Sequence, residues 1–180
     1  MKRISLAIAL ITLPTASFAL DMKAAEASVD TDMKIKLTPA IITAIKAQNA
    51  AHAGLDTATI KKLDDQWKAE VSAANKPLIN KVLNNETSAA LKKIQQASSG
   101  KYIEIFVVDN KGLNVGQTGL TSDYWQGDEA KFTKVFPTIS THSETPEFDE
   151  SAQAFVGEVD GTIVDAGVAI GTYTVKINAD

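Results

Sequence analysis

The chain has 180 residues, 44% of them apolar, which suits one globular domain and argues against intrinsic disorder. Its 22 acidic residues outnumber 18 basic ones, giving a net charge of −4 at neutral pH. Such an acidic chain is a poor candidate for binding nucleic acid or an anionic membrane surface. The absence of cysteine excludes disulfides and a lipid-anchored cysteine.

The first residues have the order of a secretory signal peptide. Lys2 and Arg3 form a basic start, residues 4–13 an apolar run, and residues 17–19 (Ser-Phe-Ala) a small-x-small exit. The run is shorter than the roughly 20 residues of a spanning helix, which favours cleavage over an uncleaved anchor. The sequence therefore predicts cleavage after Ala19 and a location in the periplasm.

Cleavage would also change the charge chemistry of the chain. The net charge would move from −4 to −6, because Lys2 and Arg3 leave together. Arg3 is the only arginine in the sequence. An anionic ligand would then have to be held by lysine, backbone N–H groups or neutral donors, since no guanidinium fork remains.

Helical patterns follow a small, acidic stretch, residues 20–33, which has no periodic pattern and predicts a loose lead. Residues 34–52 read as a helix with Pro39 in its first turn. The next helix carries one apolar stripe at three- and four-residue steps, made of Ile60, Leu63, Trp67, Val71, Ala74, Leu78 and Val82. Pro77 should kink or restart this helix, and Trp67 on the stripe is predicted to pack in the core.

After residue 100 the period changes to two. Residues 102–108 alternate as a strand, a tight Asp-Asn-Lys-Gly turn follows, and residues 113–117 read as the returning strand. Later strand-like runs are separated by glycines and cover residues 154–159, 162–170 and 172–178. The stretch around Asp149 reads as a solvated loop. The sequence thus predicts an α+β fold, with long N-terminal helices packed on an antiparallel sheet of about five strands.

Two stretches carry a resemblance to a known family. They are EIFVVDNKGLNVGQT, which begins at Glu104, and TSDYWQGDEAKF, which begins at Thr121. Together they resemble the PAS-like extracytoplasmic sensor domains called Cache or PDC, and more closely periplasmic single-Cache proteins. The resemblance covers residues 57 to 178. It implies three parts: a signal peptide (1–19), an N-terminal lead and helix (20–56) and a Cache sensor domain (57–180).

The resemblance also implies a ligand site between the sheet and its crossover loops. By position, Tyr124 and Trp125 match the aromatic lining of that site, and Asp128 and Lys131 match its polar contacts. Asp165 joins them as an acid within the last hairpin, where a turn or edge charge is the alternative. Amino-acid-binding members carry an arginine beside the aromatic pair, and this sequence has none there.

The aromatic pair leaves the ligand's charge open. Tyr124 and Trp125 supply flat apolar area with polar edges, which suits a planar or methylated ligand. With Asp123 or Asp128 they could hold an amine through cation–π contact and charge, whereas an anion would depend on Lys131. The alternative is that both rings cap the sheet as a satellite core.

Catalysis and metal binding find little support in the sequence. His52 and His142 are the only histidines, neither has a flanking catalytic motif, and there is no cysteine for zinc. Glu158, Asp160 and Asp165 lack the EF-hand spacing, although a calcium or magnesium site stays open. We therefore expect no enzyme and no cofactor.

These observations predict a sensor module in the periplasm that binds a small molecule such as an organic acid, an amine or a similar metabolite. It would act in signal perception through a partner, such as a membrane receptor or a sensor kinase. The alternative is a structural or inhibitory interaction protein of the same fold without a ligand. We expect a monomer, with a weak homodimer through the helix at residues 34–52 as the alternative.

Overall fold

The computed structural model describes residues 20–149 and 153–179, so the predicted signal peptide lies outside the described residues. Five helices precede the sheet: α1 (Met22–Lys36), α2 (Pro39–Ala51), α3 (Thr57–Ser72), α4 (Pro77–Leu83) and α5 (Glu86–Ala97). Pro77 opens α4, as predicted for a restart, because the first turn of a helix needs no proline N–H. None of the helices within these two ranges is long and apolar enough to cross a bilayer.

The loose lead predicted for residues 20–33 is wrong, because most of it belongs to α1. Asp21 caps this helix, its carboxylate accepting from the N–H groups of Lys23 and Ala24. Val29 and Met33 on one side are fully buried in the main core. Because the sequence of α1 has no clear apolar stripe, the helix is specified by the sheet it packs on rather than by its own pattern.

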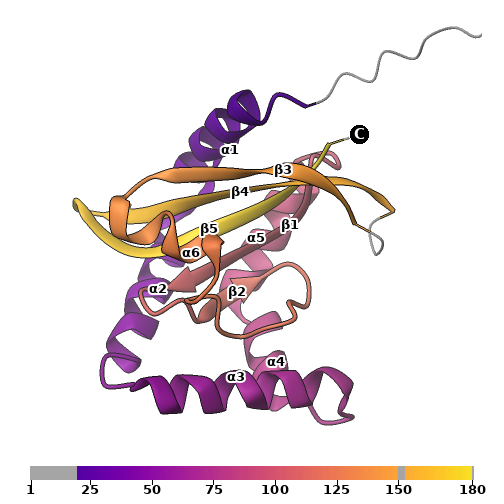
Figure 1. Cartoon of the computed structure of the whole chain (residues 1–180). Helices are drawn as coiled ribbons and strands as arrows, with labels where there is room; N and C mark the ends of the chain where they lie inside the picture. Colours follow the sequence, from indigo (N-terminus) through magenta and orange to yellow (C-terminus); the bar gives the residue numbers. More distant parts are fainter. Residues whose placement is uncertain (1–19, 150–152, 180) are drawn as a thin grey trace, which may run out of the picture.

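The sheet has five antiparallel strands in the order β2-β1-β5-β4-β3, which confirms the predicted strand number (Figure 1). The strands are β1 (Tyr102–Asp109), β2 (Asn114–Gln117), β3 (Thr141–Asp149), β4 (Ala154–Asp165) and β5 (Val168–Asn178). The last two are longer than the predicted runs, since β4 continues through Gly161 and β5 through Gly171. A tight turn at Ala166 and Gly167, both with positive φ, joins them.

The solvated loop predicted around Asp149 is also wrong, because that stretch is the edge strand β3. Its residues are half-buried or exposed, so no apolar alternation marks it in the sequence. A bulge between Glu144 and Glu147 interrupts its pairing with β4. The opposite edge strand, β2, is short, and its first residue lies beside residues 124–126, where Asn114 N–H donates to the Tyr124 carbonyl.

Two faces of the sheet differ in what covers them. On the helix face, α1, α2 and α5 pack against apolar side chains that include Ile105, Val159 and Val175. The other side, here called the loop face, is crossed by residues 118–140, which contain α6 (Ala130–Thr133) and the 3-10 helix η1 (Phe136–Thr138) (Figure 1). Helix α3 lies beyond α4 and forms a second apolar cluster around Trp67, which is fully buried as predicted.

Candidate ligand-binding site

The loop face presents two parallel rows of polar side chains. Directly opposed residues of antiparallel strands point to the same side of a sheet, so the strand register defines the rows. The central row runs through Gln117, Phe106, Thr174, Asp160 and His142. The neighbouring row runs through Glu104, Lys176, Glu158 and Glu144. A face with this composition is unusual for a sheet that is covered.

The covering segment packs on the loop face through a small apolar cluster. Phe132 of α6 and Phe136 of η1 stack with ring centroids 4.8 Å apart. Both belong to a cluster with Phe106 and Val108 of β1. The cluster anchors the segment over one part of the face, and polar side chains fill the rest.

Several of these polar side chains are buried with unmet hydrogen-bonding capacity. Asp160 is 0% exposed; its Oδ1 accepts from the Thr174 hydroxyl at 2.7 Å, and its Oδ2 has no partner among the described residues. The same holds for Gln117 Nε2 and for Asn114 Oδ1, which lies opposite Val108 on this face. Each such atom costs about 1–3 kcal/mol if it stays unpaired. Buried polar atoms of this kind ordinarily meet a partner.

Two acids on β4 share an electrostatic environment that favours their neutral forms. Burial raises the pKa of Asp160 well above its ordinary value, and the nearby Glu158 carboxylate adds to that rise. Burial also raises the pKa of Glu158, against the opposing effect of Lys131 and Lys176. Two residues apart on one strand, both acids point to the loop face.

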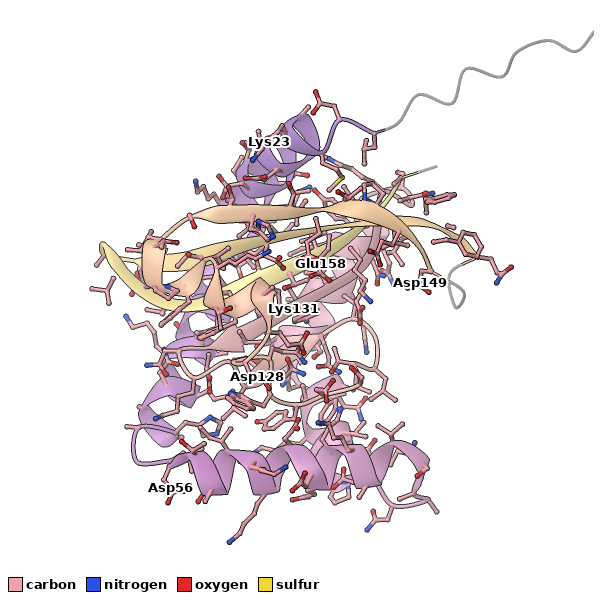
Figure 2. All side chains as sticks on the ribbon, in the orientation of Figure 1. Lys23, Asp56, Asp128, Lys131, Asp149 and Glu158 are labelled. Atoms are coloured by element: carbon pink, nitrogen blue, oxygen red, sulfur yellow. The ribbon has the colours of Figure 1, made fainter. Side chains whose placement is uncertain are left out.

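Lys131 of α6 is the cation nearest to this pair of acids in the described part of the chain. Its Nζ lies 3.6 Å from Glu158 Oε2, 3.2 Å from Glu129 Oε2 and 5.7 Å from the ring centroid of Phe106. Figure 2 shows Lys131 and Glu158 next to each other. Burial alone would lower the pKa of Lys131, but Glu158 and Glu129 outweigh it and raise that pKa. The raised pKa of Lys131 favours the charged form of the lysine, whereas the raised pKa of Glu158 favours the neutral form of the acid.

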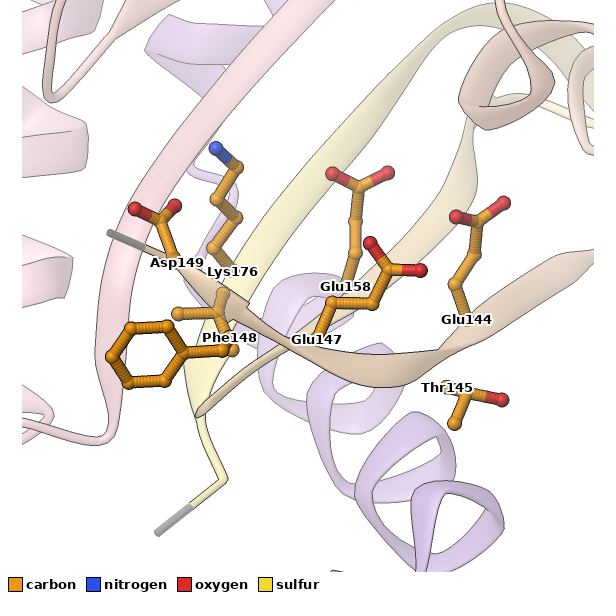
Figure 3. A pocket seen from close by; sticks show the side chains of 8 residues that line it. Glu144, Thr145, Glu147, Phe148, Asp149, Glu158 and Lys176 are labelled. Carbon is orange, nitrogen blue, oxygen red and sulfur yellow. The ribbon is translucent and has the colours of Figure 1, made fainter. Parts of the chain in front are cut away.

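An open groove of about 400 Å³ lies at the β3 side of the face. It is lined by Glu144, Thr145, Glu147, Phe148, Asp149, Val156, Glu158 and Lys176. Figure 3 shows the carboxyl groups of Glu144, Glu147 and Glu158 gathered on one side of it. A smaller hollow of about 270 Å³ shares Asp149 and Lys176 with the groove, so the two adjoin. The volume of the larger groove, about 400 Å³, suits a small organic molecule.

The structure places the predicted aromatic pair away from the loop face. Tyr124 is 4% exposed, and its ring stacks on Trp67 of α3 with centroids 5.5 Å apart. The half-buried Trp125 donates its Nε1–H to the Lys111 carbonyl at 2.8 Å. Both backbone N–H groups donate to Asp64 Oδ1, at 3.0 and 3.1 Å. This packing fits the satellite-core alternative, and a ligand contact by the pair stays a prediction.

The other three predicted site residues also lie apart from one another. Asp165 at the end of β4 forms an ion pair with Lys46 of α2 at 2.6 Å. Asp128 is exposed, in the turn before α6. Lys131 alone of the five contacts the acids of the loop face. Sequence reasoning missed Asp160 and Glu158 as site residues; their placement on either side of Val159 within a strand was the available signal.

Within residues 20–149 and 153–179, no three potential ligands of histidine, aspartate or glutamate are arranged to hold a metal ion.

No protein-family model matches the chain, and a search of curated proteins finds no relative. Solved structures with similarity include the sensory domain of a Campylobacter jejuni chemoreceptor, with 13% identity over 87% of this chain and a TM-score of 0.42. The ligand-binding domain of a Pseudomonas aeruginosa amino-acid chemoreceptor in complex with GABA has 10% identity over 88%, and a TM-score of 0.44. The sensor domain of a V. cholerae histidine kinase has 12% identity over 88%, and a TM-score of 0.39.

The chain spans less than two thirds of each of these solved chains, with 64%, 61% and 58% of their lengths covered. Similarity at this level does not identify a shared ligand.

Proposed function

We propose that this protein is a small-molecule-binding sensor module whose ligand lies on the loop face, beneath residues 118–140. One observation carries the proposal. The described residues have three buried side-chain atoms without a hydrogen-bond partner, and all three lie on this face, on Asn114, Gln117 and Asp160. A purely structural face would be expected to be apolar or internally satisfied. A polar ligand supplies the missing partners.

The proposal includes a place and a mode of action. The order of residues 1–19 supports export to the periplasm with cleavage of the signal peptide. The chain would act by binding rather than by catalysis and would pass its state to a partner, such as a membrane receptor or a sensor kinase. The resemblance of the hairpin and of the stretch from Thr121 to Phe132 to single-Cache proteins supports this reading.

A thermal-shift screen of the ligand-stripped protein tests the binding proposal. Organic acids, amines and amino acids are the compounds to screen. A ligand at 100 times its Kd should stabilise the protein by about 2.7 kcal/mol. That is a rise of roughly 5–11 °C in the melting temperature for a domain of this size.

Two aspartates of β4 provide matched variants. Asp160→Asn should abolish the shift, whereas Asp165→Asn, at the C-terminal end of the strand, should leave it intact. If no compound gives a shift, the protein is better explained as an interaction partner without a ligand. A shift lost only in Asp165→Asn would place the site at the last hairpin instead.

A further inference from the structure

The loop face and its covering segment carry more carboxylates than ammonium groups. The acids include Glu104, Glu129, Glu144, Glu147, Asp149, Glu158 and Asp160, and the lysines are Lys131, Lys134 and Lys176. The excess is negative, and around the shielded side chains of Glu158, Asp160 and Lys131 charges interact more strongly than in bulk solvent. A region of this kind attracts cations and repels anions.

The lysines of this region are already engaged. Lys176 pairs with Glu104 at 3.2 Å, and Lys134 lies 3.6 Å from Glu144. Lys131 is held by Glu129 and Glu158, as described above. An anionic ligand would therefore have to draw a lysine away from a carboxylate. Among the acids, by contrast, Asp160 has a buried Oδ2 atom without a hydrogen-bond partner within the described structure.

The surroundings of the Lys131 ammonium group indicate which chemical group such a site would bind. Its ammonium group sits between a carboxylate, that of Glu158, and the ring of Phe106 at 5.7 Å from the centroid. A carboxylate combined with an aromatic face is the chemistry that binds amines and methylated ammonium groups. The lysine side chain is only 18% exposed, so it fills this position rather than reaching past it into solvent.

On the premise of the proposed function, we infer that the ligand is an organic cation, an amine, whose positive group takes the place of the Lys131 ammonium between Glu158 and Phe106. Lys131 then acts as an internal competitor that neutralises Glu158 when no ligand is bound. When the ligand binds, the Glu158 carboxylate pairs with the ligand instead of with Lys131. The ion pair between Lys131 and Glu158, which helps to hold α6 on the sheet, is then lost. Asp160, two residues along β4, completes the site with its unpaired oxygen.

The charge of Lys131 gives opposite expectations for the two classes of ligand. Removing the charge frees Glu158 for an amine, so amine binding should tighten. An anion would lose the cation nearest to the buried acids, so its binding should weaken. The same variant therefore decides between the two classes that the sequence leaves open.

The test is calorimetric titration of the full chain with trimethylamine, 1,4-diaminobutane and succinate at low ionic strength. Lys131→Met, which keeps an unbranched apolar side chain and removes the ammonium group, should tighten amine binding about tenfold, equivalent to ~1.4 kcal/mol. Lys134→Met, on the same covering segment, should change it less than about twofold, since solvent screens the charge of this half-exposed lysine. Glu158→Gln should abolish amine binding, and Lys131→Gln checks the result if the methionine variant folds poorly.

The inference would be overturned if Lys131→Met weakened amine binding. It would also be overturned if succinate bound the wild type and only Lys131→Met abolished that binding. In the succinate case the proposed site would stand, because Asp160→Asn would still discriminate it, and only the charge of the ligand would be wrong. If the wild type and the Lys131 variants bind none of the three probes while an uncharged compound gives a thermal shift, the inference fails alone. If nothing binds at all, the proposed function fails with it.

Discussion

Replacing Tyr124 by alanine tests whether the aromatic pair belongs to the core or to the ligand. The ring is 4% exposed and is stacked on Trp67 at an interplanar angle of 20°. Removing a buried aromatic ring costs about 3–5 kcal/mol, and such a stack contributes about 0.5–1.5 kcal/mol of it. We therefore expect Tyr124→Ala to lower the free energy of unfolding by about 3–5 kcal/mol.

Urea denaturation followed by tryptophan fluorescence measures this loss directly. At about 2–4 °C per kcal/mol for a domain of this size, the melting temperature should fall by roughly 6–20 °C. Tyr124→Phe is the matched control, because it keeps the ring and the stack and should lose less than about 1 kcal/mol. Ligand affinity in the folded fraction should be the same in the wild type and in both variants.

The opposite pattern would refute this reasoning. If Tyr124→Ala loses less than about 1 kcal/mol of stability and also loses ligand binding, the ring contacts the ligand. The packing of Tyr124 on Trp67 would then not describe the protein in solution, and the site implied by the family resemblance would be restored.

Two further changes test the loop face and the sheet. The pKa of Asp160 is raised in the folded state, so its stabilising contribution is complete below the unfolded pKa of about 3.9 and is lost as pH rises through the folded pKa. Asp160→Asn, which mimics the neutral acid, should melt above the wild type at pH 8 by a margin that shrinks toward pH 4; a margin that grows toward pH 4 would contradict this. Gly171→Ala should lower the free energy of unfolding in urea by about 1–3 kcal/mol or more, because its Cβ would lie 2.0 Å from the Val108 carbonyl oxygen. Gly54→Ala, with open space around the new Cβ, should cost less than about 1 kcal/mol, and equal losses in both variants would show that the close approach is not rigid.

Local signals explain which parts of the fold were predictable. The hairpin of β1 and β2 is written in consecutive residues, and Asp109 holds its turn by accepting from the Lys111 N–H, as predicted for a turn aspartate. Helix α1 and strand β3 were missed for a common reason. Each depends on contact with the other: Glu26 of α1 accepts hydrogen bonds from Thr141 and Ser143 of β3.

The candidate site, too, depends on contacts that the sequence alone does not show. The sequence places Glu158 and Asp160 on either side of Val159, but it does not show that residues 118–140 cover the face to which they point. Nor does it show which layer buries Tyr124, since stacking on Trp67 joins residues that are far apart in the chain. Lys131 was identified because the family resemblance assigned it by position, without its partners.

Strand β3 has a consequence for the behaviour of the protein at high concentration. An exposed sheet edge is a template for a strand of another molecule, and stacking of this kind leads to aggregation. Here the edge carries a bulge, the proline Pro146 and the acids Glu144 and Glu147, each of which opposes regular pairing with a second chain. At the opposite edge, residues 124–126 pair with residues 112–114, at the start of β2. Both ends of the sheet thus resist growth into fibrils.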